Sequence, residues 1–382
     1  MGKATRWTVV VLALALYATG AFWFAAQTPI YRLFRSSGPA HVSYERALVT
    51  AVQAESLEKD EHGGLLTGYQ DLAVRILTGP RAGAEVSIRN FLNYTTNFRL
   101  GPGSEIIAHV DTADADHSTV SVYTPDRSWA VYALALVFVA VLCGVGGWRG
   151  VRSLLGILFT FTSLLFVFIP LLYRGWSPVL AATVLTATIV CVSLLLLDGL
   201  KVKTVSAILG SLVGLGLSAL LEALFQGATQ TSGYASADAD ALLAISGQTG
   251  LKVGELLFAG VLVASMGAIM DVAISVASAV CEVRDSSPSL LPKNLFKSGM
   301  NVGRDMMGAM ANTLILAFTG ASLNTLILLY SLEHSFYQVL NSNAVVIEVG
   351  EALTASLAVM LTVPAVALFT AALSRKSRHR LP

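Results

Sequence analysis

Charged side chains are scarce in this chain of 382 residues: Asp, Glu, Lys and Arg together make up 13%. Soluble domains carry about 25%, so the chain has too few charges to cover a water-facing surface. Hydrophobic residues reach 54%, and the mean hydropathy is +0.67. These values exclude a soluble or disordered protein. They predict an α-helical polytopic membrane protein.

Several motifs that carry chemistry are also missing. No glycine-rich loop holds the lysine of a nucleotide site, and no His-Glu-x-x-His motif is present. The six histidines are scattered, and there is no basic block of the nucleic-acid type. We expect no metal, no cofactor, no nucleic-acid partner and no enzyme activity. Cys143, Cys191 and Cys281 fall in or beside apolar runs, which indicates helix packing rather than disulfides.

Apolar runs long enough to cross a bilayer recur along the chain. A spanning helix needs about 20 mostly apolar residues, and eight runs meet this condition. The second and third are joined only by the basic turn Gly147–Val151, which predicts a helical hairpin. The expected spans are Trp7–Ala26, Trp129–Gly146, Leu154–Tyr173, Pro178–Leu197, Val202–Phe225, Leu256–Val280, Met306–Leu329 and Ala352–Leu373.

Basic residues indicate the orientation, because they collect in cytoplasmic loops. With a cytoplasmic N-terminus, the short outer loops hold only Arg174 and Lys252. Both termini are therefore expected inside, and residues 27–128 outside. The first run also fits a cleaved signal peptide, but Trp23 and Phe24 make a poor cleavage site, so an uncleaved anchor is favoured. The inner side would hold Lys3, Arg6, Arg149, Arg152, Lys201, Lys203, Arg284, Lys293, Lys297, Arg304, Arg375, Lys376, Arg378 and Arg380.

Only residues 27–128 have the composition of a soluble domain. Their alternating apolar and polar residues are typical of half-buried strands. The segment Thr78–Gly83 predicts the turn of a β-hairpin, and residues 31–45 predict a linker. We expect a small antiparallel β domain of five or six strands, with a barrel as one form. The alternation covers Leu72–Ile76, Ala84–Ile88, Ile106–Val110 and Val120–Val122. The predicted domains are thus 1–26 (anchor), 27–128 (outer β domain) and 129–382 (seven helices and a basic tail).

Asp271 is the clearest functional candidate, because it lies inside an apolar run. A charged carboxylate at mid-membrane costs roughly 2.5–3.5 kcal/mol on insertion scales, so such an acid indicates function. Gly267 and Ser275 share its helix face and leave room for water or another helix. A carboxyl that binds and releases protons suits proton coupling. The alternative is a protonated Asp that is hydrogen-bonded across a helix interface.

The run Met306–Leu329 supplies a partner face with Gly308 and Asn312 on one side. An intramembrane Asn usually faces other helices, since lipid cannot satisfy its amide. We expect Asn312 near Asp271, with simple helix packing as the alternative. Asp305 is expected where this helix begins. It would be either a first-turn acid stabilised by the helix dipole or an inner exit for the proton.

Four glutamates lie at the expected outer ends of spans, where few basic residues balance them. Glu255, Glu348 and Glu351 are expected at or just before helix N-termini, where the dipole favours acids. Glu222 is expected at a helix C-terminus. Together they predict an acidic outer mouth, and four independent interfacial acids are the alternative.

Two further patterns concern packing and the inner surface. Gly210 and Gly214 recur at a spacing of four, which is typical of closely packed membrane helices. Residues Pro288–Met300 place basic side chains on one side and apolar ones on the other. This pattern predicts a separate amphipathic helix at the inner membrane surface.

Two blocks of this sequence resemble the YibE/F-like bacterial membrane proteins. They are Met266–Cys281 (MGAIMDVAISVASAVC) and Gly303–Leu323 (GRDMMGAMANTLILAFTGASL), and Leu77–Gly79 and Gly146–Gly150 are also similar to that family. The resemblance covers nearly the whole chain. It implies a multi-pass protein of the bacterial cytoplasmic (inner) membrane, and the family has no assigned function.

The order of the last helices is also similar to the end of SecD/SecF and the wider RND transporters. An intramembrane acid relays protons there, and the matching residue is Asp271. This chain departs from the pattern in having two extra preceding helices and no mid-membrane Lys or Arg. The resemblance implies a homodimer or a paired membrane subunit in the bilayer.

The acid in an apolar span predicts a proton- or ion-coupled transporter or export-assisting factor. A proton or ion gradient would drive it, and the β domain would bind an outer client. The alternative is a non-transporting membrane scaffold whose β domain binds an envelope partner.

Overall fold

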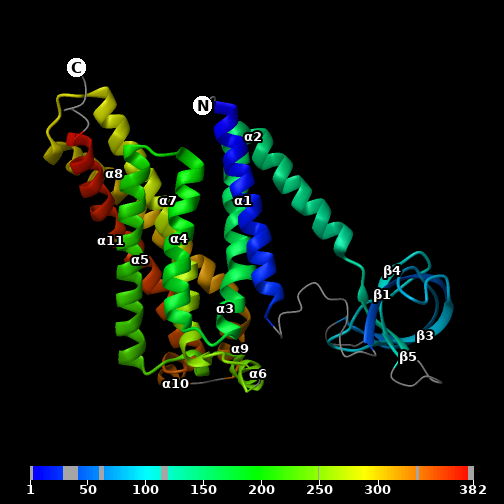
Figure 1. The fold of residues 1–382 in the computed structure, drawn as a ribbon. Helices are drawn as coiled ribbons and strands as arrows, with labels where there is room; N and C mark the ends of the chain where they lie inside the picture. The colour runs from blue at the N-terminus through cyan, green and yellow to red at the C-terminus, as the bar shows by residue number, and fades with distance from the viewer. Residues whose placement is uncertain are drawn as a thin grey trace. The chain divides into compact units, whose positions relative to one another are not determined.

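The computed structural model describes residues 3–28, 42–59, 64–112, 119–247, 249–332 and 335–376. The chain divides into two compact units. One is helical and combines Met1–Tyr31 with Leu142–Pro382. The other, Arg32–Val141, holds the β-sheet and the first part of α2. Figure 1 shows the elements of both units.

Long helices run through the helical unit, with short ones in the connections (Figure 1). A π-helical turn, Leu164–Phe168, continues α2 into α3, and the 3₁₀ turns Gly233–Ala235 and Val253–Glu255 lie in the loop before α7. The helices are α1 (Lys3–Ala26), α2 (Ser128–Ser163), α3 (Ile169–Tyr173), α4 (Pro178–Asp198), α5 (Val202–Thr229), α6 (Ala239–Ser246), α7 (Leu256–Ser286), α8 (Pro292–Ala321), α9 (Leu323–Ser331), α10 (Phe336–Leu340) and α11 (Asn343–Lys376).

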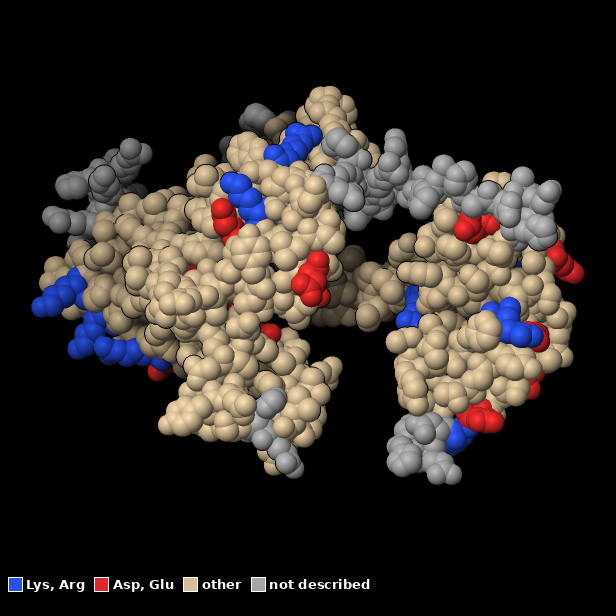
Figure 2. Space-filling model, turned by 90° about the horizontal axis from the view of Figure 1, so that it is seen from below, with Lys and Arg blue, Asp and Glu red and all other residues tan. Residues whose placement is uncertain are grey.

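Within the described residues, six helical segments are long and apolar enough to cross a membrane. The count is seven if α8 and α9, which are bent by 62°, form one broken span. Figure 2 shows how little of the visible face of this unit is charged. These segments make the chain a membrane protein, while the expected count of eight spans stays a prediction.

One of the six segments, Ser128–Tyr173, contains the expected turn between two spans. Gly147 has non-helical backbone angles (φ 54°, ψ −135°). A Cβ on Gly150 would overlap the carbonyl oxygen of Leu142, so these two residues lie side by side. In a continuous helix, residues eight positions apart would be separated by about 12 Å along the axis. The chain therefore turns sharply inside Gly147–Val151.

The core of the helical unit forms around α7, which packs against α4, α5, α8 and α11. Its fully buried side chains recur every three or four residues, and they include Ile269, Val272, Ala273 and Val276. This spacing places them on one broad face of the helix. The buried face of α7 thus sets the positions of its four neighbours.

α5 and α11 approach each other closely at two glycines. A Cβ on Gly210 would overlap the Val366 side chain, and one on Gly214 would overlap Thr362 Oγ1. Small residues let membrane helix backbones come close, so that dispersion contacts and hydrogen bonds form between them. The expected packing role of Gly210 and Gly214 agrees with this geometry.

The predicted interfacial helix at Pro288–Met300 is wrong as a separate element. Residues 292–321 form the single helix α8, whose first turns pack into the bundle. The reason is steric, because Gly299 lies against Val280 and Ala367, and Gly303 lies against Val363. Asp305 consequently lies well inside α8 and not at a helix start, which corrects the first-turn prediction.

The β unit is a five-stranded antiparallel sheet with strand order β3-β2-β1-β4-β5. The two edge strands, β3 and β5, contact each other, so the sheet curls towards a barrel. All four alternating segments found in the sequence are strands. The strands are β1 (Val42–Lys59), β2 (Leu66–Ile76), β3 (Glu85–Leu92), β4 (Glu105–Asp111) and β5 (Thr119–Pro125).

The central strand β1 was missed, and the linker expected at residues 31–45 is wrong from Val42 onward. Residues 31–41 lie outside the described part of the chain. The alternation of β1 is masked because the buried Glu45 occupies an inward position, and because two irregularities shift its register against β2.

Ion pairs tie the ends of the β unit together. Arg46 on β1 pairs with Glu105 at 2.6 Å and with Asp126 at 2.9 Å. Hydrogen bonds from Ser128 and the Arg46 guanidinium hold the pKa of Asp126 below its ordinary value. The carboxylate of Asp126 thus links strand β1, through Arg46, to the first residue of α2, Ser128.

The close crossing of α5 and α11 predicts that replacing glycine by alanine changes stability in opposite directions at Gly210 and at Gly216. Gly210→Ala should destabilise the protein by about 1–3 kcal/mol, because the added methyl group overpacks Val366. Gly216→Ala on the same helix meets nothing within 4 Å and should stabilise it by up to about 1 kcal/mol through helix propensity. Thermal unfolding in detergent measures both, and equal midpoints for the two variants would contradict the packing.

Candidate functional site

Three glutamates gather where α5 ends and α11 begins, and we call Glu222, Glu348 and Glu351 the carboxyl cluster. Glu222 comes from α5, and the other two lie about one turn apart on α11. Glu351 is within electrostatic reach of both Glu222 and Glu348. The structure therefore brings together three of the four acids of the predicted outer mouth.

Glu222 is the most buried member of the cluster, with 2% of its surface exposed. Its Oε1 accepts a hydrogen bond from Gln226 Nε2 at 2.8 Å. Its Oε2 accepts one from Thr354 Oγ1 on α11 at 2.9 Å. Both donors are neutral, and no ion pair reaches Glu222 from any described residue. A buried acid with only neutral partners is unusual, because buried charges are normally paired.

Thr354 can serve both protonation states of Glu222. Its hydroxyl also lies 2.8 Å from the carbonyl oxygen of Gly350. A threonine hydroxyl has one hydrogen to donate and two lone pairs that accept. It can donate to an ionised Glu222, or it can donate to Gly350 and accept the proton of a neutral Glu222. Gly350 packs against the Phe225 ring, with no room for a Cβ, which brings the two helices to this distance.

The fourth acid, Glu255, lies apart from the cluster. It ends the 3₁₀ turn before α7 and accepts a hydrogen bond from Ser177, which precedes α4. Among the described residues, no hydrogen bond joins it to the carboxyl cluster. Glu255 thus couples the starts of two helices, and its position before a helix agrees with the expectation.

The expected positions of the other three acids within their helices need correction. α11 begins at Asn343, nine residues before the apolar run at Ala352, so Glu348 and Glu351 lie beyond its first turn. α5 continues to Thr229, so Glu222 lies about two turns before its end. Contacts such as Gly350 with Phe225 keep both helices ordered beyond their apolar runs. These three acids therefore lie too far from the helix ends to be stabilised by the helix dipoles.

Asp271 lies halfway along α7, 15 residues from each end, or about 22 Å from either. Its side chain and Gly267 are on the exposed face of the helix, and Ser275 is half-buried. A Cβ on Gly267 would meet nothing within 4 Å. In the described part of the chain, no hydrogen bond or ion pair reaches Asp271. The predicted stripe thus exists, with open space beside it.

Gly308 and Asn312 are exposed on α8. Gly299 packs on Val280, and the two helices run in opposite directions, so Gly308 stands nearly level with Asp271. No hydrogen bond joins Asn312 to Asp271 within the described residues. Asn312 lies four residues, about one turn, beyond that level, and the hydrogen bond expected between it and Asp271 is not formed.

The sequence interpretation missed the polar side chains that link the helices. Gln226 and Thr354 hold Glu222, and Ser218 on α5 shares a 3.0 Å hydrogen bond with Ser265 on α7. Single hydroxyls in apolar helices usually bond to their own backbone, so the sequence carried no signal for them. No group of three His, Cys, Asp or Glu able to hold a metal ion occurs among the described residues.

Comparison with known proteins gives one match. The sequence model of the YibE/F-like protein family matches residues 134–376. No curated protein and no solved structure matches the chain. The similarity to SecD/SecF and RND transporters therefore has no support from these comparisons.

The hydrogen bond between Thr354 and Glu222 predicts a specific loss of stability. Thr354→Val should cost about 1–3 kcal/mol, because it leaves a buried carboxyl oxygen without its donor. Thr370→Val is the matched control, since this threonine is also buried and its one hydrogen bond among the described residues goes to the Val366 carbonyl of its own helix. Thermal unfolding in detergent compares the two. A loss for Thr370→Val as large as that for Thr354→Val would contradict the assignment.

Proposed function

This chain belongs to the YibE/F-like family, and we propose that it is a proton- or ion-coupled transporter or export-assisting factor of the bacterial cytoplasmic membrane. One observation carries the proposal. Glu222 is buried between two membrane helices, and its hydrogen-bond partners among the described residues are neutral groups that suit both of its protonation states.

The electrostatics of the carboxyl cluster favour ion uptake at this point. Three carboxyls share one region, and like charges disfavour simultaneous ionisation. A proton or cation that arrives there relieves this repulsion. Glu348 and Glu351 therefore raise the local concentration of cations near Glu222. In the predicted topology the cluster lies at the outer side, so it would be the entry.

Asp271 is the second coupling acid in this proposal. It lies at the middle of α7, where an ionised carboxylate is costly. The buried hydrogen bond between Ser218 and Ser265 lies between it and Glu222 along the two helices. Protonation of Asp271 would follow uptake at the cluster, and the exposed Asp305, three residues before Gly308 on α8, would pass the proton on towards the inner side.

The central prediction is loss of ion flux when either coupling acid is neutralised. Purified protein in liposomes with an internal pH dye, under a pH gradient and a voltage, should conduct protons or exchange them for a second ion. Glu222→Gln and Asp271→Asn should lower this flux at least tenfold, because neither side chain can then release a proton. Glu255→Gln should keep it, because Glu255 lies outside the cluster.

Two outcomes would argue against coupling. Full flux by both variants would exclude these acids as coupling sites. A loss that Glu255→Gln shares equally would show a general effect on folding, which the thermal unfolding of each variant measures separately.

An exposed aromatic group on the β unit favours the second candidate function, a scaffold that binds an envelope partner. Tyr44 packs edge-on against His109 and Tyr123, with ring centroids 5.4 and 5.0 Å apart. Tyr44 and Tyr123 are 44% and 57% exposed. Aromatic side chains are enriched at interfaces because they bury large areas at low entropy cost.

The scaffold function predicts a partner at this aromatic group. A photoreactive residue at Tyr44 or Tyr123 should give a defined cross-linked product in intact cells. The same residue at Tyr94, a tyrosine of the same sheet unit with 74% exposure, should not. Equal products at all three positions would indicate random collisions rather than an interface. A variant with both Tyr44→Ala and Tyr123→Ala that keeps its ion flux would show that partner binding and ion transport use different residues.

A further inference from the structure

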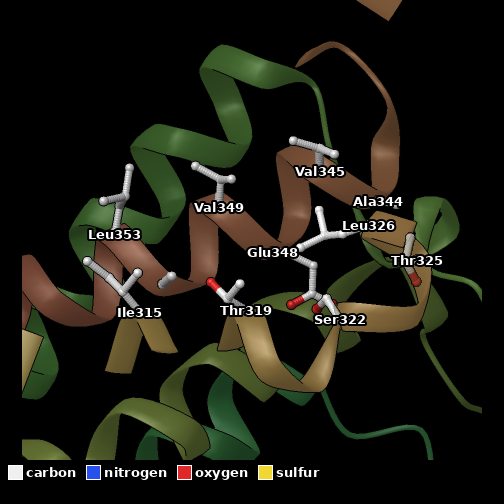
Figure 3. Close-up of a pocket in the computed structure, with 11 residues that line it drawn as sticks. Ile315, Thr319, Ser322, Thr325, Leu326, Ala344, Val345, Glu348, Val349 and Leu353 are labelled. Carbon is white, nitrogen blue, oxygen red and sulfur yellow. The ribbon is translucent and has the colours of Figure 1, made fainter. Parts of the chain in front are cut away.

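A pocket of about 130 Å³ lies where α8 ends, α9 begins and α11 starts (Figure 3). The 62° bend between α8 and α9 at Ser322 separates the end of α8 from α9 and leaves this space beside α11. Most of its lining is aliphatic. These side chains are Ile315, Leu326, Ala344, Val345, Val349, Ala352 and Leu353.

One carboxylate enters this apolar pocket. Figure 3 shows the Glu348 carboxyl pointing towards Ser322, and the hydroxyl residues Thr319, Ser322 and Thr325 also line the pocket. Among the described residues, no hydrogen bond or ion pair satisfies Glu348. The Ser322 hydroxyl donates to the Phe318 carbonyl, so its oxygen remains able to accept. The polar side of the pocket therefore offers acceptors for a cation.

The size of the pocket limits the apolar part of a ligand. An engineered cavity of about 150 Å³ lined by Leu, Ile and Phe holds one benzene molecule. A space of about 130 Å³ thus suits a single ring or a short branched alkyl group. A bare metal ion fits poorly, because it needs several oxygen ligands and the described residues contain no cluster of three metal-binding side chains.

We propose that this pocket binds a small amphiphilic organic cation, with a ring-sized apolar group among the aliphatic side chains and an ammonium group on Glu348. Charge complementarity identifies the ligand class, because Glu348 is the only charged residue among the described residues that line the pocket. Glu351, which is within electrostatic reach of Glu348, adds negative potential and no competing cation. The ammonium donates to Glu348, and Thr319 and Ser322 provide further acceptors.

The site goes beyond the proposed function, since ligand binding needs no ion gradient. The test uses the purified full-length protein in detergent and benzylammonium as the probe, with calorimetric titration. Wild type should bind benzylammonium, and benzyl alcohol, which has the same ring without the charge, should bind at least about tenfold more weakly. Glu348→Gln should weaken benzylammonium binding by a similar factor, and Val345→Trp should abolish it by filling the pocket.

Two controls keep the result specific. Glu255→Gln removes an acid outside the pocket and should bind benzylammonium as wild type does. The thermal unfolding midpoint of Glu348→Gln should match wild type, because the substitution preserves the shape of the side chain.

Three results would overturn the proposal. The first is equal affinity of wild type and Glu348→Gln for benzylammonium. The second is equal affinity of wild type for benzylammonium and benzyl alcohol. The third is complete loss of amine binding when phosphatidylethanolamine is added, which would assign the pocket to a lipid headgroup. These results concern ligand binding and not the ion flux assigned to Glu222. The pocket proposal can therefore be wrong while the transport proposal holds, and the reverse is also true.

Discussion

The close crossing of α5 and α11 is the constraint on which the candidate site depends. Gly210 and Gly214 let the two backbones approach, and Gly350 does the same against Phe225 farther along. This approach brings Thr354 within 2.9 Å of Glu222. A larger side chain at any of these glycines would separate the helices and would remove the hydrogen bond that makes a buried carboxyl tolerable. Packing and site chemistry are therefore set by the same contacts.

The bilayer gives these polar groups their significance. In water a Glu, a Thr and a Gln would form weak and replaceable hydrogen bonds, but in an apolar interior each unsatisfied group costs free energy. Within the described part of the chain, the donors that satisfy Glu222 are both neutral. A basic partner would have fixed its charge, whereas Thr354 can change from donor to acceptor. The same reasoning applies to Glu348, whose apolar pocket is lined, as far as the structure describes the chain, by hydroxyl and aliphatic groups and by no basic side chain.

The sequence predicted much of the architecture and less of the site. Apolar runs located the helices, alternation located four strands, and the spacing of Gly210 and Gly214 indicated close packing. The extents of α8 and α11 were wrong, because contacts at Gly299, Gly303 and Gly350 keep these helices ordered beyond their apolar runs. The pairing of Glu222 with Thr354 depends on the register between two helices distant in sequence, and one sequence carries no information on that register. For the same reason the sequence predicted a contact between Asn312 and Asp271, and no hydrogen bond among the described residues makes it.

The most direct test of this account is an infrared difference spectrum of the purified protein between an acidic and an alkaline buffer. If Glu222 takes up and releases a proton while hydrogen-bonded to Thr354, the spectrum should contain a carboxyl C=O band that Glu222→Gln removes. Thr354→Val should shift this band, because the hydrogen bond to the carboxyl changes. An identical spectrum in wild type and Glu222→Gln would show that Glu222 does not change protonation, and it would contradict a coupling role for the buried acid.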